Sequence, residues 1–268
     1  MNWMHEAYRD NLERFRRRDG FKALVAYGLV MGSCFFQGWL YTTDLSVTIL
    51  NLSQLWIALF FLVVCTIYMI DSKEGWGSIG ITTSNGKRSI LLGVLGGVLL
   101  LGLQMALTRP QGTALSILRP ALLPWLMFIV CAVEEELLFR GYIQTRLSGL
   151  IRIPWLASVV NALFFLSVHY PVRWVVSGTV SLGVLSGVYV VLLLVLHGLC
   201  DGVYKKTNCL WGSIVLHIIY NAVGAMVVFQ ESWAGKKKNH SWKGVVRDAV
   251  QLSTVRCSKV APFSWRRQ

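Results

Sequence analysis

Long apolar runs separated by short polar segments dominate this chain. Each run comes close to the roughly 20 residues that an α-helix needs to cross a bilayer. The runs lie at about 21–41, 50–70, 89–107, 120–138 with an extension towards 147, 153–170, 174–199 and 209–230. We therefore predict an all-α fold, a polytopic transmembrane helix bundle of about seven spans, with six to eight compatible with the pattern.

Two polar ends flank the apolar region. Residues 1–20 form a polar lead-in, and residues 231–268 form a basic tail that includes Lys236, Lys237 and Lys238. Neither a linker rich in Pro, Gly or Ser nor a repeat of fixed period divides the stretch between them. We predict one transmembrane domain over 21–230, with both ends solvated.

Composition and charge agree with a membrane protein. Of the 268 residues, 54% are hydrophobic and 15% are charged, a balance that a soluble domain of this size would not normally show. The net charge of +13 could indicate a nucleic-acid partner, but Lys and Arg concentrate in the N-terminal segment, in alternate loops and in the tail. That distribution predicts contact with anionic lipid, no nucleic-acid partner and a cytoplasmic N-terminus, in the plasma membrane.

The basic tail complicates this topology. Seven spans would place it on the side opposite to the N-terminus, so a re-entrant segment, an additional span or an exported tail all remain open. The six Cys contain no CxxC pair, and five of them lie inside or at the ends of apolar runs. We interpret them as small core residues, not as disulfides or metal ligands.

Four ionisable side chains interrupt the fourth apolar run: Glu134, Glu135, Glu136 and Arg140. A charge at the bilayer centre costs about 2.5–3.5 kcal/mol on insertion scales, so such side chains usually have partners and a function. Helix positions four apart share a face, which pairs Arg140 with Glu136 and turns Glu135 to another side. A desolvated carboxylate suits general-base chemistry. Taken alone, the cluster could also be a solvated helix end.

Three further polar side chains lie in later apolar runs. His169 follows Phe165 by four residues, and Asn221 follows His217 by four, so the members of each pair share a helix face. His217 and Asn221 would not be expected to face lipid, and we predict that they point to other helices or into a common interior cavity, an intramembrane polar cavity. A packed or interfacial histidine is the alternative for His169, and His197 is interpreted as structural or as lining the cavity.

These motifs, in this order, resemble the type II CAAX prenyl endopeptidase family, also called CPBP or Abi. The resemblance covers roughly residues 120–225, and we take this range as the motif core. It implies an intramembrane endopeptidase of membrane-anchored proteins, in which Glu135 activates a water and His169 helps to position it. It further implies that His217 and Asn221 polarise the scissile carbonyl and hold the oxyanion, while Glu136 and Arg140 brace the site. Glu134 could compete for the role of the base, though register favours Glu135.

A metal-dependent alternative uses the same side chains. Glu135, His169 and His217 could bind zinc with an open position for water. The chain has no HExxH helix, and we prefer glutamic catalysis without a cofactor. Two other functions are possible on this pattern: a proton-coupled transporter, because buried Glu and His also mark ion pathways, and a non-catalytic immunity or assembly protein on the same scaffold. The complete set of motif residues favours the endopeptidase.

Overall fold

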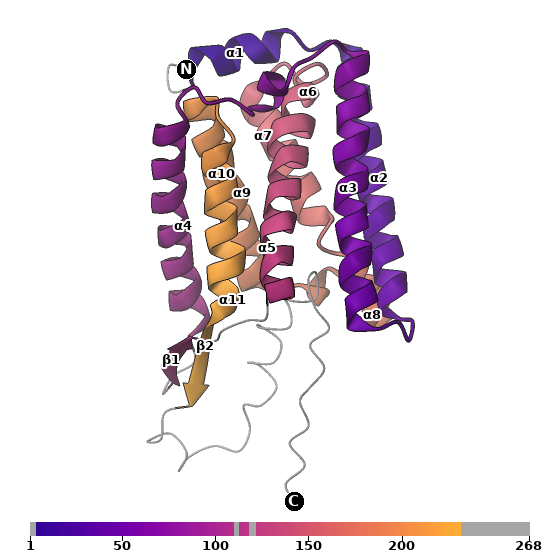
Figure 1. Cartoon of the computed structure of the whole chain (residues 1–268), viewed down its shortest axis with the longest axis vertical. Coiled ribbons are helices and arrows are strands. Elements are labelled where there is room, and N and C mark those ends of the chain that lie inside the picture. Colours follow the sequence, from indigo (N-terminus) through magenta and orange to yellow (C-terminus); the bar gives the residue numbers. More distant parts are fainter. Residues whose placement is uncertain (1–3, 110–112, 118–121, 232–268) are drawn as a thin grey trace, which may run out of the picture.

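Long helices lie side by side in a bundle, with one short helix across its end (Figure 1). The computed structural model describes residues 4–109, 113–117 and 122–231. The helices are α1 (Glu6–Glu13), α2 (Arg17–Tyr41), α3 (Val47–Asp71), η1 (Trp76–Ile79), α4 (Gly86–Thr108), α5 (Leu122–Glu135), η2 (Glu136–Gln144), α6 (Thr145–Leu147), α7 (Pro154–Ser167), α8 (Pro171–Ser177), η3 (Leu182–Val184), α9 (Gly187–Thr207), α10 (Trp211–Ile218), η4 (Ile219–Val223) and α11 (Gly224–Met226). The predicted all-α bundle is confirmed.

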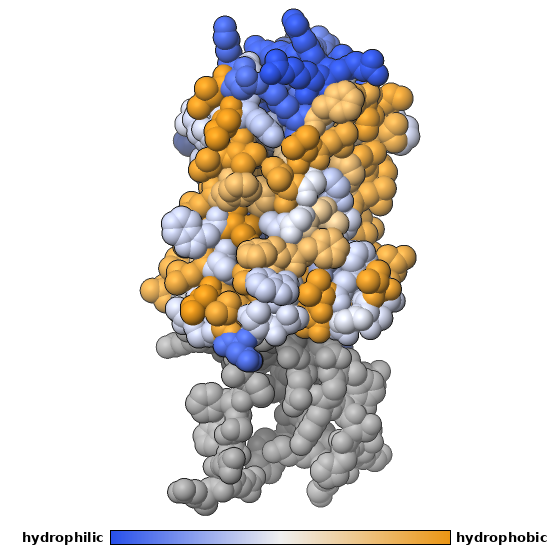
Figure 2. Space-filling model, turned by 90° about the vertical axis from the view of Figure 1, so that its right-hand side faces the viewer, coloured by the Kyte–Doolittle hydropathy of each residue, from blue (hydrophilic) through white to orange (hydrophobic). Residues whose placement is uncertain are grey.

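The outside of the bundle is a lipid-facing surface. Figure 2 shows a hydrophilic cap at one end and a hydrophobic belt below it. Large apolar side chains are exposed on several helices, among them Leu99 of α4 at 71% and Trp56 of α3 at 70%. Transfer of such apolar surface from water into lipid is favourable, and large apolar patches are rarely exposed to water. The protein is therefore an integral membrane protein.

Five helical stretches among the described residues are long and apolar enough to cross a bilayer. They are Arg17–Tyr41, Thr48–Asp71, Gly86–Thr108, Pro154–Ser177 and Gly187–Thr207. A shorter apolar helix covers Trp211–Met226, and the segment from α5 to α6 carries the glutamate cluster. The count of about seven spans stays a prediction.

The structure departs from the predicted helices in two places. The run 174–199 is broken, because Gly178 ends α8 in a left-handed conformation (φ 66°) and the Ser186 hydroxyl caps the start of α9. The last run leaves the helix at Met226 and continues as β2 (Val227–Glu231). This strand pairs antiparallel with β1 (Thr113–Ile117), so that Thr113 lies opposite Glu231.

The polar lead-in includes a packed helix. Helix α1 lies across the end of the bundle (Figure 1), and its Tyr8 is buried there. The hydroxyl of Tyr8 accepts a hydrogen bond from Gln144 Nε2 (3.2 Å), and Asn11 Nδ2 donates to the Ser78 carbonyl (2.9 Å). The basic tail from residue 232 lies outside the described residues, and the division at 20 and 230 stays a prediction.

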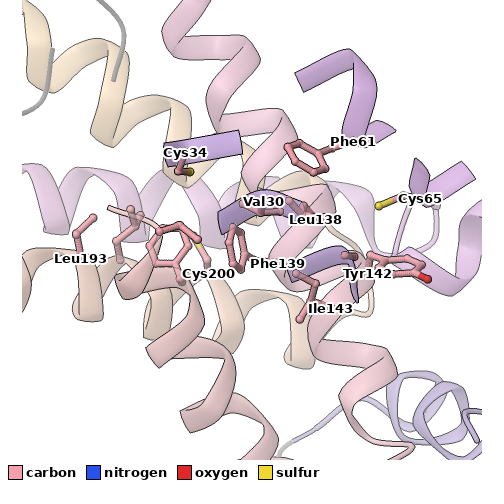
Figure 3. Close-up of a cluster of buried hydrophobic side chains, with 14 of the residues drawn as sticks. Val30, Cys34, Phe61, Cys65, Leu138, Phe139, Tyr142, Ile143, Leu193 and Cys200 are labelled. Carbon is pink, nitrogen blue, oxygen red and sulfur yellow. The ribbon is translucent and has the colours of Figure 1, made fainter. Parts of the chain in front are cut away.

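Segment η2 runs through the middle of the core. Figure 3 shows its Leu138, Phe139, Tyr142 and Ile143 among side chains from other helices. The five Cys within the described ranges are buried and form no disulfide there. Glycines bring α4 against α10, since a Cβ on Gly93 would lie 2.1 Å from the Gly212 carbonyl oxygen and one on Gly212 would lie 2.1 Å from the Ser89 carbonyl oxygen. Small residues thus let two backbones touch where larger ones would separate them.

Candidate active site

The glutamates lie where a regular helix widens. Glu135 is the last residue of α5, and η2 continues from Glu136 as a π-helix. Segment η4, which contains Asn221 and begins two residues after His217, is a second π-helical stretch. Such stretches often occur at functional sites because they re-aim side chains. Both helices that carry the sequence motifs therefore have altered geometry at the motif itself.

Glu136 holds two of the predicted side chains. Its Oε1 atom lies 2.9 Å from Arg140 Nη1 and accepts a hydrogen bond from His217 Nδ1 at 2.8 Å. Glu136 and Arg140 are both fully buried, and the Arg140 guanidinium lies over the Phe165 ring, 4.2 Å from its centroid. The structure thus contains the ion pair expected from helical register, and this pair also orients a histidine from another helix.

Glu135 faces the other side of the same histidine. Its Oε2 atom lies 3.8 Å from His217 Nε2, and both side chains are buried. This distance is too long for a direct hydrogen bond and leaves room for a water that contacts both atoms. Glu134 is half-buried near Cys65 of α3, and is not among the residues that line the cavity described next.

A small cavity of about 50 Å³ lies beside Glu135 and His217. Its polar lining includes the four predicted catalytic residues, Glu135, His169, His217 and Asn221. They come from α5, from the turn after α7 and from the continuous helix formed by α10 and η4, so three separate segments meet at one point. The volume exceeds the roughly 30 Å³ share of one water in the liquid. The structure therefore brings together every catalytic side chain that the sequence motifs indicated.

His169 is fixed by its backbone neighbours. Its Nδ1 atom donates to the Phe165 carbonyl (2.7 Å), because a carbonyl oxygen only accepts. Arg173 Nη1 donates in turn to the His169 carbonyl at 2.8 Å. A neutral His169 with its proton on Nδ1 leaves Nε2 as an acceptor, which can orient a water.

Several cavity residues were missed by the sequence motifs. Gln104 of α4 and Tyr189 of α9 line the cavity, as does Tyr220. Gln104 could have been found as one of two hydrophilic side chains in the run 89–107, whereas the tyrosines look like ordinary core residues. His197 is buried and packs 5.6 Å from the Phe165 ring centroid, outside this lining.

The zinc site considered as an alternative is not found as a cluster of ligands among the residues that the structure describes. In residues 4–109, 113–117 and 122–231, no group of three or more His, Cys, Asp or Glu side chains is close enough to hold a metal ion. His217 Nδ1 is held by Glu136 and His169 Nδ1 by a carbonyl, so each histidine has one nitrogen engaged in the protein. In both histidines Nε2 takes no part in these two hydrogen bonds, and no chemical step below uses a metal.

The fold and site define a polytopic helical membrane protein with a buried Glu, His and Asn cavity. Residues 117–223 match the family model described as type II CAAX prenyl endopeptidase Rce1-like. The match confirms the resemblance inferred from the motifs and covers less than half of the chain. It includes every predicted catalytic and bracing residue, and at family level it indicates a membrane endopeptidase. Comparison of the chain with curated proteins and with solved structures gave no match.

Proposed function

We propose that this protein is an intramembrane endopeptidase that hydrolyses peptide bonds of membrane-anchored proteins with a glutamate-activated water. The observation that carries the proposal is the approach of Glu135 Oε2 to His217 Nε2, at 3.8 Å, on the wall of a buried cavity. A water between these atoms would contact a base on one side and a histidine on the other. The family match over 117–223 supports the same reaction class.

The first step is a proton transfer. The Glu135 carboxylate takes a proton from the water while the water oxygen attacks the scissile carbonyl carbon, and His169 Nε2 accepts the second water hydrogen. The cavity is small and lies among apolar helices, so little bulk water reaches it. The Glu135 carboxylate is therefore the main acceptor for this proton. Glu135 then returns the proton to the leaving amine as the C–N bond breaks.

The second requirement is stabilisation of the oxyanion. Asn221 and His217 would donate to the oxygen that becomes negative, a contribution that is strongest in a water-poor site. His217 donates through Nε2 when its ring carries both protons, while Nδ1 donates to the Glu136 carboxylate. Arg140 keeps Glu136 in place, so the ion pair acts on the substrate through His217.

The proposed function also includes a class of substrate and an orientation in the membrane. We infer that a lipid-anchored peptide, such as a prenylated CAAX terminus, reaches the cavity from the bilayer. We propose that the end of the bundle that carries α1 faces the cytoplasm and that the membrane is the plasma membrane; the Lys and Arg residues of the N-terminal segment support this orientation.

Comparative proteomics tests the proposed function. Membrane-anchored peptides would be compared in cells that carry the wild type or the Glu135→Gln variant, which has nearly the same shape. A processed peptide present only with the wild type is the expected result. Unchanged peptides, together with substrate-dependent charge movement in proteoliposomes, would contradict the endopeptidase function and favour a carrier.

A further inference from the structure

A polar side chain of the cavity comes from a helix outside the segment that matches the family. Gln104 belongs to α4, and residues 117–223 are the matched segment. Its Oε1 atom is buried and has no hydrogen-bond partner in the part of the chain that the structure describes. A buried acceptor without a partner is costly, so such atoms usually serve a bound molecule or an ordered water.

Close packing fixes the position of this amide. Glycines bring α4 and α10 together, and the same parallel alignment continues to Gly224 of α11. A Cβ added to Gly224 would lie 3.2 Å from Gln104 Oε1, which means that glycine leaves just enough room for the amide. Gln104 is therefore held one turn beyond Asn221, on the same cavity wall as the proposed oxyanion donor.

We propose that Gln104 is a substrate-binding residue whose side-chain oxygen accepts a hydrogen bond from a backbone N–H of the peptide being cleaved. This inference rests on the proposed function. An extended peptide presents a carbonyl and an N–H at each residue, so a chain whose scissile carbonyl meets Asn221 offers neighbouring N–H groups to the same wall. The other polar groups assigned to the reaction engage the water or the carbonyl. Gln104 supplies what they lack, an acceptor for the peptide backbone.

This role predicts an effect on binding more than on chemistry. The hydrogen bond exists in both the ground state and the transition state, so its loss raises KM and leaves kcat close to the wild-type value. One neutral hydrogen bond corresponds to a change of about 3- to 10-fold in affinity. A merely structural Gln104 would instead lower the amount of folded enzyme.

The test pairs a protein variant with modified substrates. Gln104→Leu removes the acceptor at similar size, and Gln37→Leu is the matched control, because the buried Gln37 amide of α2 accepts from Ser53 (3.3 Å) and is not among the cavity lining residues. The probe is a farnesylated CAAX peptide in detergent micelles, together with a series of analogues that are each N-methylated at one backbone nitrogen. Kd is measured on the Glu135→Gln background, and KM and kcat on the active enzyme.

We expect one N-methyl position to weaken binding to the Gln104 protein about 3- to 10-fold and to leave binding to Gln104→Leu unchanged. The Gln37→Leu control should behave as the parent protein. Equal losses in parent and Gln104→Leu at every position would overturn the assignment of Gln104 while the proposed function stands. Absence of both binding and cleavage in the wild type would overturn the proposed function, and this inference with it. If Gln104→Leu does not fold, Gly224→Ala gives a second variant, because its added Cβ crowds the same amide. It should weaken binding at the same position of the peptide. No weakening there would also contradict the assignment.

Discussion

Replacing Arg140 by Met would leave the Glu136 carboxylate charged and fully buried, with the His217 ring and the Cys200 thiol as polar neighbours. Breaking a buried ion pair from one side costs about 3–5 kcal/mol. The guanidinium also lies over Phe165 at 4.2 Å, and a desolvated contact of this kind adds up to about 2 kcal/mol. At 1.4 kcal/mol per factor of ten, the pair alone corresponds to roughly two to three and a half orders of magnitude in the folding equilibrium.

A double-mutant cycle isolates the electrostatic part of this cost. Glu136→Gln removes the charge and keeps the shape, so Arg140→Met combined with Glu136→Gln no longer buries an uncompensated carboxylate. We expect the double variant to recover most of the stability lost in Arg140→Met, since neutral replacements of buried pairs are often well tolerated. It should not recover activity, because His217 would still lack its charged partner.

Reversible unfolding in mixed detergent micelles, followed by tryptophan fluorescence, measures these free energies of unfolding. Arg18→Met is the control, because Arg18 and its partner Asp71 are 76% and 49% exposed and an exposed ion pair contributes little. A loss below about 1 kcal/mol in Arg140→Met would refute the reasoning, given the 3–5 kcal/mol expected of a buried pair. Strictly additive effects in the double variant would refute it as well.

Three further predictions address the packing, the water and the metal. Gly212→Ala should prevent stable folding, since its Cβ would lie 2.1 Å from the Ser89 carbonyl oxygen. The control Gly102→Ala has open space around the added Cβ and should fold normally. The yield of detergent-resistant monomer compares the two variants. His169→Ala should fold and lower kcat by about 10²-fold in a peptide-cleavage assay, because an oriented water is lost, and an unchanged kcat would remove His169 from the mechanism. A preparation dialysed against chelator should retain cleavage, and recovery of activity only on addition of zinc would overturn the metal-free mechanism.

Much of the fold could be predicted from the sequence because lipid constrains it strongly. Backbone groups in a bilayer must be bonded within the segment, so an apolar run of sufficient length is a helix, and the predicted runs overlap α2, α3, α4 and α9. The break between Ser177 and Gly187 was not predicted, because the intervening residues are apolar enough to look helical. Gly178 and Ser186 end the helices on either side through local backbone conformation and capping, which hydropathy does not measure.

The site was predictable where residues share a helix. The spacing of Glu136 and Arg140 gave their ion pair, and the spacing of His217 and Asn221 gave their common cavity. What joins separate helices was not predictable in the same way. The hydrogen bond from His217 to Glu136 connects positions 81 residues apart, and the π-helical geometry of η2 and η4 was not predicted. Gln104 was missed for the same reason, because its place depends on the glycine contacts between α4 and α10.

The central claim is that Glu135 activates a water and does not itself attack the substrate. A single turnover of purified enzyme in H₂¹⁸O, with a membrane-anchored peptide substrate and mass spectrometry of product and enzyme, tests it directly. The account predicts one ¹⁸O in the new carboxyl terminus, none in Glu135, and a cleavage rate lowered at least about 10²-fold in a normally folded Glu135→Gln variant. Label in the Glu135 carboxyl group, or undiminished cleavage by Glu135→Gln, would contradict it.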